Sequence, residues 1–315
     1  MRHRVFWMLI LLILIVSFAF VIYTSILDYK SEGVRSTELT IISGVSPNKF
    51  HDRVDVLATV LSINPLEGKV ALRLEFTVTG KFADKHHLPT QDIHVATNTS
   101  QSLIVLEKGN WLMPYYVDVK LFNGVVADYP FDSHIGVIEL YSYIEDKNSG
   151  EFKPVPIRVG QKGYIPGFKI ASKGIEPSDE YKNTYAGIVM TITRAKTTKA
   201  VAIFIIVMLW LMTFSIMAVT ISMIFFGRPL EFSSFAWIGA MLFAFFSFRM
   251  SAPDIPPIGG YFDFISFFWC LILVSMCLVG LVIKYLLDDE RRIENEIRSK
   301  ESRKQKTVSE PQNME

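Results

Sequence analysis

Residues 200–226 read AVAIFIIVMLWLMTFSIMAVTISMIFF, a run of 27 residues with no charged side chain. As an α-helix this run is about 40 Å long, which exceeds the roughly 30 Å hydrocarbon core of a bilayer. Three other uncharged runs occur, at Val5–Leu27, Phe232–Phe248 and Phe264–Ile283. The sequence therefore predicts an integral membrane protein with four transmembrane α-helices, and it excludes a soluble enzyme.

These runs divide the chain into eight segments. We expect a cytoplasmic N-terminus (1–4), a first transmembrane helix (5–27), an extracytoplasmic domain (28–199), a second helix (200–226), a third helix (232–249), a Pro-rich outer loop (250–263), a fourth helix (264–287) and a charged cytoplasmic tail (288–315). No A-x-A-like cleavage site follows the first run, so we expect it to be retained as an anchor.

Basic residues set the orientation of the helices. Arg2 and Arg4 precede the first run, and the chain after the last uncharged run carries eight Lys and Arg residues from Lys284 to Lys306. Short flanks rich in Lys and Arg remain in the cytoplasm, so both termini are expected there. Four spans also place both termini on the same side of the membrane. We therefore expect a multi-pass protein of the plasma (inner) membrane with its large domain outside.

The outer domain has a hydrophobic period of two. In Lys69–Thr79 apolar residues alternate with more polar ones, as they do in a strand with one buried face. Further alternating or β-like runs lie at Leu39–Ile42, Val54–Ile63, Asp92–Ala96, Leu103–Leu106, Tyr116–Phe122, Ile135–Ile144, Pro154–Val159 and Ala186–Arg194. Around nine short strands separated by turn signals predict an all-β, sandwich-like domain, with a barrel as the alternative. The glycines at 160, 163 and 167 are expected to punctuate a loop.

Charge and cysteine content narrow the function. Segment 28–199 contains 20 Lys and Arg and 20 Asp and Glu, a net charge of zero. Nucleic-acid binding relies on excess positive charge, so it is excluded. The two cysteines, Cys270 and Cys277, both lie in the last apolar run. The outer domain therefore has neither a disulfide nor a cysteine-based metal site.

The first unusual motif is residues 123–134, NGVVADYPFDSH. Its central residues are Tyr129, Pro130, Phe131 and Asp132. Asn-Gly and proline favour turns, and an aspartate can accept turn N–H groups. We expect a corner in which Phe131 buries its ring and Asp132 accepts those N–H groups. The alternative is a contact point between the outer domain and the membrane helices.

The second motif joins the third and fourth helices. Arg249 ends one helix, Pro256 and Pro257 stiffen the loop, and Asp263 opens the next helix. A cation at a helix C-terminus and a carboxylate at an N-terminus are both favoured by the helix dipole. We expect capping and interfacial placement, with an ion pair across the loop or a membrane pathway as alternatives.

Together these features resemble the integral-membrane family known as domain-of-unknown-function family 4436. The resemblance rests on Tyr129–Asp132 after an Asn-Gly turn and on the series from Pro256 to Trp269, and it spans roughly residues 5–290. His134 stands where a bulkier aromatic or basic residue is expected. The resemblance implies the architecture but no activity. A fainter similarity links the corner at Tyr129–Asp132 to the outer domain of pentameric ligand-gated channels, although the flanking cysteines of that corner are missing.

Histidines are the only candidate metal ligands. His86, His87 and His94 lie close in sequence, together with Asp84 and Asp92, but their spacing matches no common ligand pattern. No nucleophile-elbow, zinc-protease or phosphate-binding glycine motif occurs. We therefore expect surface histidines, no cofactor and no metal.

Three functions remain open from the sequence. The first is non-enzymatic binding of a ligand or partner by the outer β domain. The second is a channel or transporter component, and the third is a metal-dependent enzyme on the outer face. The lipid bilayer is the expected partner, with a homo-oligomer or another membrane protein as the alternatives for a protein partner.

Overall fold

The computed structural model describes residues 23, 26, 40–45, 50–146, 150–176, 183–226 and 232–309. The expected first span, Val5–Leu27, lies outside the described residues apart from Tyr23 and Ile26. The described chain forms two compact units. One contains the sheet domain together with residues 253–260, and the other contains residues 203–252 and 261 onward.

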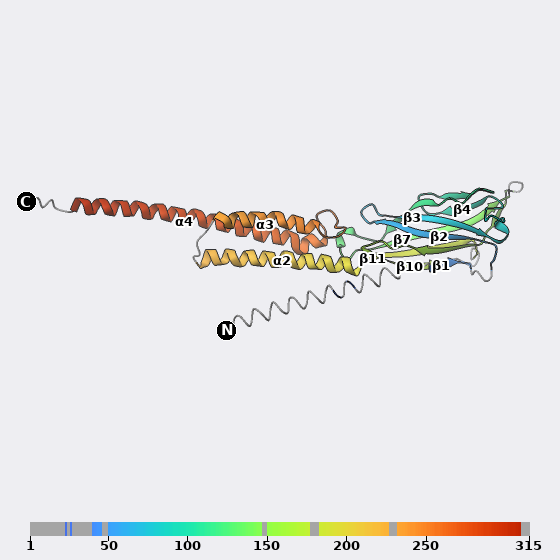
Figure 1. Cartoon of the computed structure of the whole chain (residues 1–315), viewed down its shortest axis with the longest axis horizontal. Helices are drawn as coiled ribbons and strands as arrows, with labels where there is room; N and C mark the ends of the chain where they lie inside the picture. Colours follow the sequence, from blue (N-terminus) through green and yellow to red (C-terminus); the bar gives the residue numbers. More distant parts are fainter. Residues whose placement is uncertain are drawn as a thin grey trace, which may run out of the picture. The chain divides into compact units, whose positions relative to one another are not determined.

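The sheet domain contains eleven strands among the described residues (Figure 1). They are β1 (Thr40–Gly44), β2 (Arg53–Asn64), β3 (Lys69–Thr79), β4 (Ile93–Thr97), β5 (Leu103–Leu106), β6 (Tyr115–Phe122), β7 (Ser133–Glu145), β8 (Phe152–Pro154), β9 (Ile157–Lys162), β10 (Phe168–Ile175) and β11 (Tyr185–Arg194). Short 3-10 turns lie at η1 (Gly80–Phe82) and η2 (Val126–Asp128). The large β domain expected from the sequence is confirmed.

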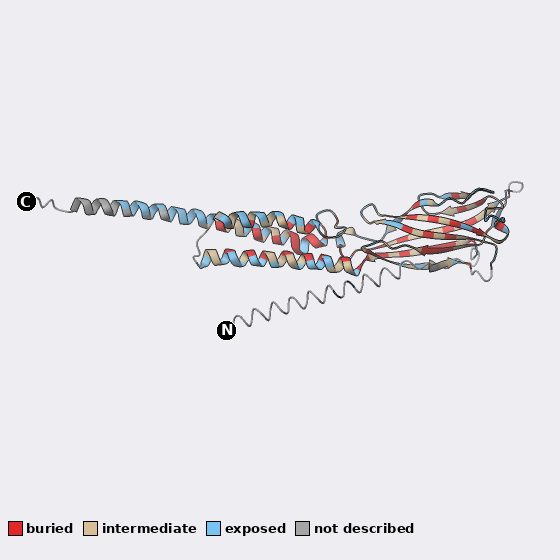
Figure 2. Cartoon of the chain, in the orientation of Figure 1, coloured by how far each residue is buried: buried red, intermediate tan, exposed pale blue. Residues whose placement is uncertain are grey.

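Strand β3 shows why the alternation was a reliable signal. It begins and ends at Lys69 and Thr79, as predicted, and Val70, Leu72 and Leu74 are fully buried. Successive side chains point to opposite faces of a strand, so one face of β3 packs into the core and the other meets solvent. The same alternation of buried and more exposed positions recurs along β2 and β7 (Figure 2).

The strands pair in one continuous path, β1-β9-β2-β3-β6-β7-β11-β10. Strands β4 and β8 pair with β7, and β5 pairs with β4. Strand β6 joins the two halves of the path, because its first part pairs with β3 and its last two residues pair with β7. The two ends of the path meet where the Ser43 hydroxyl donates to the Ile175 carbonyl at 3.2 Å. Side chains from both halves form one core. The domain thus has two facing halves, as a sandwich has, but a hydrogen-bonded path that runs almost all the way around, as in a barrel.

Two parts of the strand prediction were wrong. Strand β10, Phe168–Ile175, was not predicted, because Phe168 is its only buried residue and Lys169 and Lys173 occupy exposed positions. It nevertheless pairs with β11 along its whole length. Gly160, which was expected in a loop, lies within β9 and pairs with both β1 and β2.

Three helices follow the sheet domain. They are α2 (Lys196–Phe225), α3 (Phe232–Met250) and α4 (Phe268–Ser309), the last preceded by a π-helical segment, η4 (Asp263–Phe267). Within the described residues, three helical segments are long and apolar enough to cross a membrane, at Lys196–Phe225, Ser233–Met250 and Asp263–Arg298. The part of α4 beyond residue 285 is almost entirely exposed wherever its side chains are described (Figure 2). The charged tail therefore continues this helix as a solvated extension.

Candidate functional site

Arg194 ends the buried face of β11. Ala186, Ile188, Met190 and Ile192 point into the core at every second position, and Arg194 continues the series with only 3% of its surface exposed. A guanidinium cannot lose its charge in a protein. Burial of this cation therefore requires partners that supply negative charge and hydrogen bonds.

The partner comes from the neighbouring strand. In the antiparallel register Thr193 pairs with Ser133 and Ile192 with His134, so the residue next along, Asp132, lies opposite Arg194. The Arg194 Nε donates to both carboxylate oxygens of Asp132, at 3.0 and 3.1 Å. His134 Nε2 lies 3.1 Å from Asp132 Oδ2, and both side chains are buried.

Two aromatic rings enclose the same cation. The guanidinium carbon lies 4.5 Å from the ring centroid of Phe168 and 5.1 Å from that of Tyr129. Attraction between a cation and a ring is strongest where water is excluded. Tyr129 is fully buried, and its hydroxyl donates to the Pro253 carbonyl at 2.8 Å. Burial raises the pKa of Tyr129 to about 12, against the lowering effect of the nearby Arg194 charge.

Asp254 supplies a looser contact. Its carboxylate lies 3.6 Å from Arg194 Nη1, and its side chain is 57% exposed. This Nη1 atom is buried and has no hydrogen-bond partner among the described residues. Nη1 is therefore a buried donor without a hydrogen bond in the described part of the chain. The nearest Asp254 oxygen lies less than an ångström beyond the usual length of a charge-assisted hydrogen bond.

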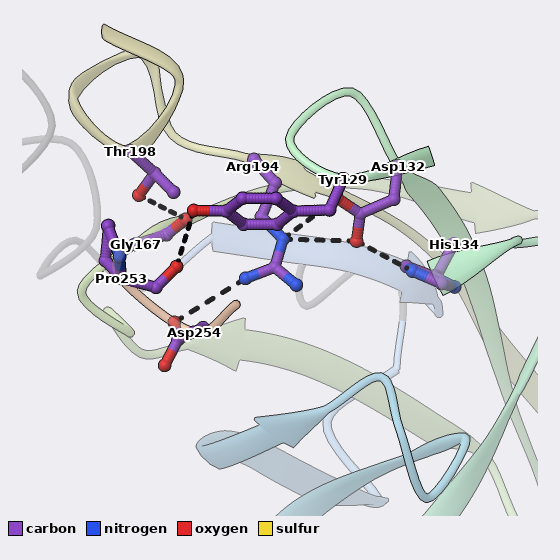
Figure 3. Close-up of polar contacts among 8 residues, drawn as sticks. All are labelled: Tyr129, Asp132, His134, Gly167, Arg194, Thr198, Pro253 and Asp254. Carbon is purple, nitrogen blue, oxygen red and sulfur yellow. Dashed lines mark hydrogen bonds and ion pairs between the residues drawn. The ribbon is translucent and has the colours of Figure 1, made fainter. Parts of the chain in front are cut away.

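We call these residues the Arg194 cluster: Tyr129, Asp132, His134, Arg194, Pro253 and Asp254. Figure 3 shows that they come from three separate segments of the chain. These segments are the corner before β7, the end of β11 just before α2, and the loop between α3 and α4. Gly167 adds a fourth, because its carbonyl accepts from the Ala195 N–H at 2.9 Å and the Thr198 hydroxyl at 3.1 Å. Several segments that are distant in sequence therefore meet around one buried charge.

The corner differs from the sequence prediction in two side chains. Phe131 was expected to bury its ring, but it is 54% exposed, and Tyr129 fills the buried position instead. Asp132 was expected to accept turn N–H groups, whereas it binds Arg194 and His134. Pro130 is buried and follows a cis peptide bond. Asp132 has these partners because its side chain points inward, opposite the buried cation of Arg194.

The second motif forms a separate ion pair in the helical unit. Arg249 Nε lies 2.7 Å from Asp263 Oδ1 and its Nη2 lies 2.9 Å from Oδ2, a two-point contact between side chains that are almost fully buried. The pair across the loop, one of the alternatives raised by the sequence, is therefore present. Pro256 is buried and Pro257 is exposed, and both belong to the sheet unit.

The histidines do not form a cluster. His86 and His87 lie on an exposed turn, whereas His94 lies on β4 and stacks on Tyr143 with centroids 5.3 Å apart. The Asp84 carboxylate accepts the His86 and Leu88 N–H groups, and these backbone hydrogen bonds lower its pKa. Among the residues that the structure describes, no three His, Cys, Asp or Glu side chains are placed to hold a metal ion.

Sequence reasoning did not identify Arg194 or Asp254 as site residues. The signal for Arg194 was available, because it occupies an inward position of the alternating run Ala186–Arg194. A charge in the inward register requires a buried counter-charge. His134 occupies an inward position of β7, and Asp132 lies two residues before it in the same register. No comparable signal marks Asp254, since its partner is 60 residues away in the chain.

The architecture defines a class of proteins in which a β-sheet domain is followed by three helices apolar enough to cross a membrane. Residues 45–191 match the family model described as domain of unknown function DUF4436. This match confirms the resemblance stated from the sequence for that part of the chain.

The match is shorter than expected. Residues 194–288 match a different model, described as domain of unknown function DUF8686. The Pro256–Trp269 series, which was thought to support the DUF4436 resemblance, lies in this second match. No curated protein matches the chain. Arg194 is the first residue of the second matched segment, and Asp132 lies within the first.

Proposed function

We propose that this chain is a non-enzymatic membrane protein whose sandwich-like sheet domain lies outside the membrane and binds a ligand or protein partner. In this proposal both termini are cytoplasmic, four helices anchor the protein in the plasma membrane, and the helices are free to associate with further copies or with another membrane protein. Long uncharged helices and basic flanks support the placement.

In this proposal the Arg194 cluster transmits movements of the sheet domain to the helices. One observation carries this part of the proposal: a single buried guanidinium touches the corner through Asp132 and the loop between α3 and α4 through Asp254. Arg194 is also only two residues before the first residue of α2. A shift of the corner that moves Arg194 therefore acts on two chain segments that continue into apolar helices, the end of β11 and the loop between α3 and α4.

The contact with Asp254 is the part that can switch. Asp132 holds Arg194 by short, buried hydrogen bonds, but Asp254 is half-exposed and 3.6 Å away. Moving Asp254 closer would create a charge-assisted hydrogen bond, and moving it away would remove the ion pair from the buried Nη1. Binding by the sheet domain changes the balance between these two states.

The binding part of the proposal is tested in the native membrane with the full chain. A membrane-impermeant crosslinker is applied to intact cells, and the products are mapped by mass spectrometry. We expect a discrete adduct joined to residues in 40–194. Adducts only within the helices, or none, would contradict it, as would robust hydrolase or transferase turnover by the purified chain.

A channel or transporter component is the second candidate. It is favoured by the same cluster, because a polar contact between a sheet corner and the loop that joins two apolar helices suits a gated pathway. The full chain reconstituted in liposomes should then pass ions or small solutes. An absence of flux across a broad panel of cations and anions would remove this candidate and leave the binding proposal intact.

A further inference from the structure

Five apolar side chains lie exposed at one end of the sheet unit. They are Leu66 (59% exposed), Phe122 (51%), Val125 (60%), Phe131 (54%) and Ile258 (57%), and we call them the base surface. Single exposed apolar residues are normal on any protein, but a group of them at one end marks a contact surface.

Hydrogen bonds and close contacts place the five together. The Leu121 N–H donates to the Gly68 carbonyl at 2.8 Å, which joins the β2–β3 turn containing Leu66 to the end of β6 at Phe122. The corner that begins after Phe122 carries Val125 and Phe131. A Cβ on Gly260 would lie 3.0 Å from the Ala127 carbonyl, so the loop with Ile258 reaches the same corner.

The first turn of α2 indicates the depth of the base surface relative to the bilayer. Lys199 Nζ lies 5.9 Å from the ring centroid of Phe131, and both residues belong to the sheet unit. Helix α2 has 30 residues, about 45 Å at 1.5 Å per residue. This length matches the roughly 40–45 Å of a bilayer with its headgroups. The first turn of α2, and Phe131 beside it, therefore fall at the headgroup level.

We infer that the base surface is a lipid-contacting surface that inserts its apolar side chains into the headgroup zone of the outer leaflet. Lys196 and Lys199 fit the same occupant, since lysines can hold their ammonium groups at the phosphates while their stems cover apolar surface. Mixed lysine and large apolar side chains are typical of segments that lie in a membrane interface. The inference rests on the proposed membrane placement of α2.

The test uses spin labels on the full chain in lipid nanodiscs. Single cysteines replace Leu66, Val125 or Phe131 in a background where Cys270 and Cys277 are serine. Collision of each label with oxygen, which concentrates in lipid, is compared with collision with a water-soluble nickel complex. Two controls accompany them: Trp111→Cys, in the exposed loop before β6, and Val207→Cys, on an exposed position within α2.

Trp111 is a suitable water-exposed control because β6 separates it from the base surface. The strand has eight residues, about 26 Å of extended chain at 3.3 Å per residue. We expect an oxygen preference severalfold higher at 66, 125 and 131 than at 111, and highest at 207.

The outcomes separate the two proposals. Base-surface labels that behave like the label at 111, with 207 in lipid, would overturn the lipid inference alone. Labels protected from both reagents would show burial against protein and would also overturn it. A label at 207 without oxygen preference would contradict the membrane placement, and the lipid inference would fail with it.

Discussion

Arg194 and Asp132 form a buried ion pair with Nε 3.0 Å from Oδ1, although 62 residues separate them in the chain. Each side chain is about 2% exposed or less. Because the two lie at the ends of adjacent antiparallel strands, the register of β7 and β11 brings them together. Asp132 lies within the first family match, and Arg194 is the first residue of the second.

Removing the cation should strongly destabilise the protein. Arg194→Met leaves the Asp132 carboxylate buried without its main partner, and breaking a buried pair in this way costs about 3–5 kcal/mol. We expect this loss in chemical denaturation of the full chain in detergent micelles. Lys153→Ala, which removes an exposed pair with Asp146, should leave the transition unchanged. A loss for Arg194→Met no larger than for that control would show that the pair is not buried.

Replacing both partners should recover much of that loss. Asp132→Leu in the Arg194→Met background removes the unpaired carboxylate and supplies apolar volume, which is often close to neutral relative to a buried ion pair. A double-mutant cycle should give a coupling energy of about 1–3 kcal/mol. Additive effects of the two substitutions would contradict a direct interaction.

His134 is held in place by a glycine. A Cβ at Gly124 would overlap the His134 imidazole, so Gly124→Ala must displace the ring from Asp132. We expect a destabilisation of about 1–3 kcal/mol, the usual range for forced overpacking. Gly136→Ala is the matched control, because its Cβ would meet nothing closer than the flexible Met190 Cε at 3.4 Å. Equal effects of the two substitutions would contradict the packing described.

Tyr129 predicts an alkaline pH dependence. Its pKa is raised by burial to about 12, whereas an unfolded tyrosine ionises near pH 10. The contribution of the neutral phenol is therefore fully present below pH 10 and is lost as the pH rises through about 12, because the unfolded chain releases the proton first. The Tyr129→Phe variant should show a smaller fall in stability over this window, in denaturation curves measured at each pH. At neutral pH it should lose about 0.5–1.5 kcal/mol with its hydrogen bond to Pro253.

Tyr116→Phe serves as the control for this effect, since Tyr116 is 63% exposed. Its alkaline profile should match that of the unsubstituted protein. If Tyr129→Phe also matches, the phenol is not buried as described.

Most of the fold was predicted from the alternation of apolar and polar residues along the strands. Residues such as Leu72 and Ile138 lie at every second position of long strands, so their burial followed from the sequence. Strand β10 could not be found this way, because Phe168 is its only buried residue, although the strand pairs with β11 along its whole length.

The candidate site was predicted only in its parts. The corner and the Arg249–Asp263 motif were found because proline, glycine and charged helix ends have strong local preferences. The contact of Tyr129 with Pro253 spans 124 positions, and no local preference encodes it. Phe131 was assigned to the core because large rings are usually buried, but the adjacent Tyr129 occupies that space.

The most direct test of the central claim is hydrogen exchange of residues 253–260 in an Asp132→Asn variant of the full chain. Asp132 binds Arg194, and Arg194 is paired with Asp254, so weakening the first contact should reach the loop. The control is Glu139→Gln, which alters a carboxylate bonded to Tyr185 elsewhere on the sheet. We predict severalfold faster exchange in the loop for Asp132→Asn and no change for Glu139→Gln. Unchanged loop exchange in a folded Asp132→Asn protein would contradict the claim that the Arg194 cluster couples the sheet domain to the helices.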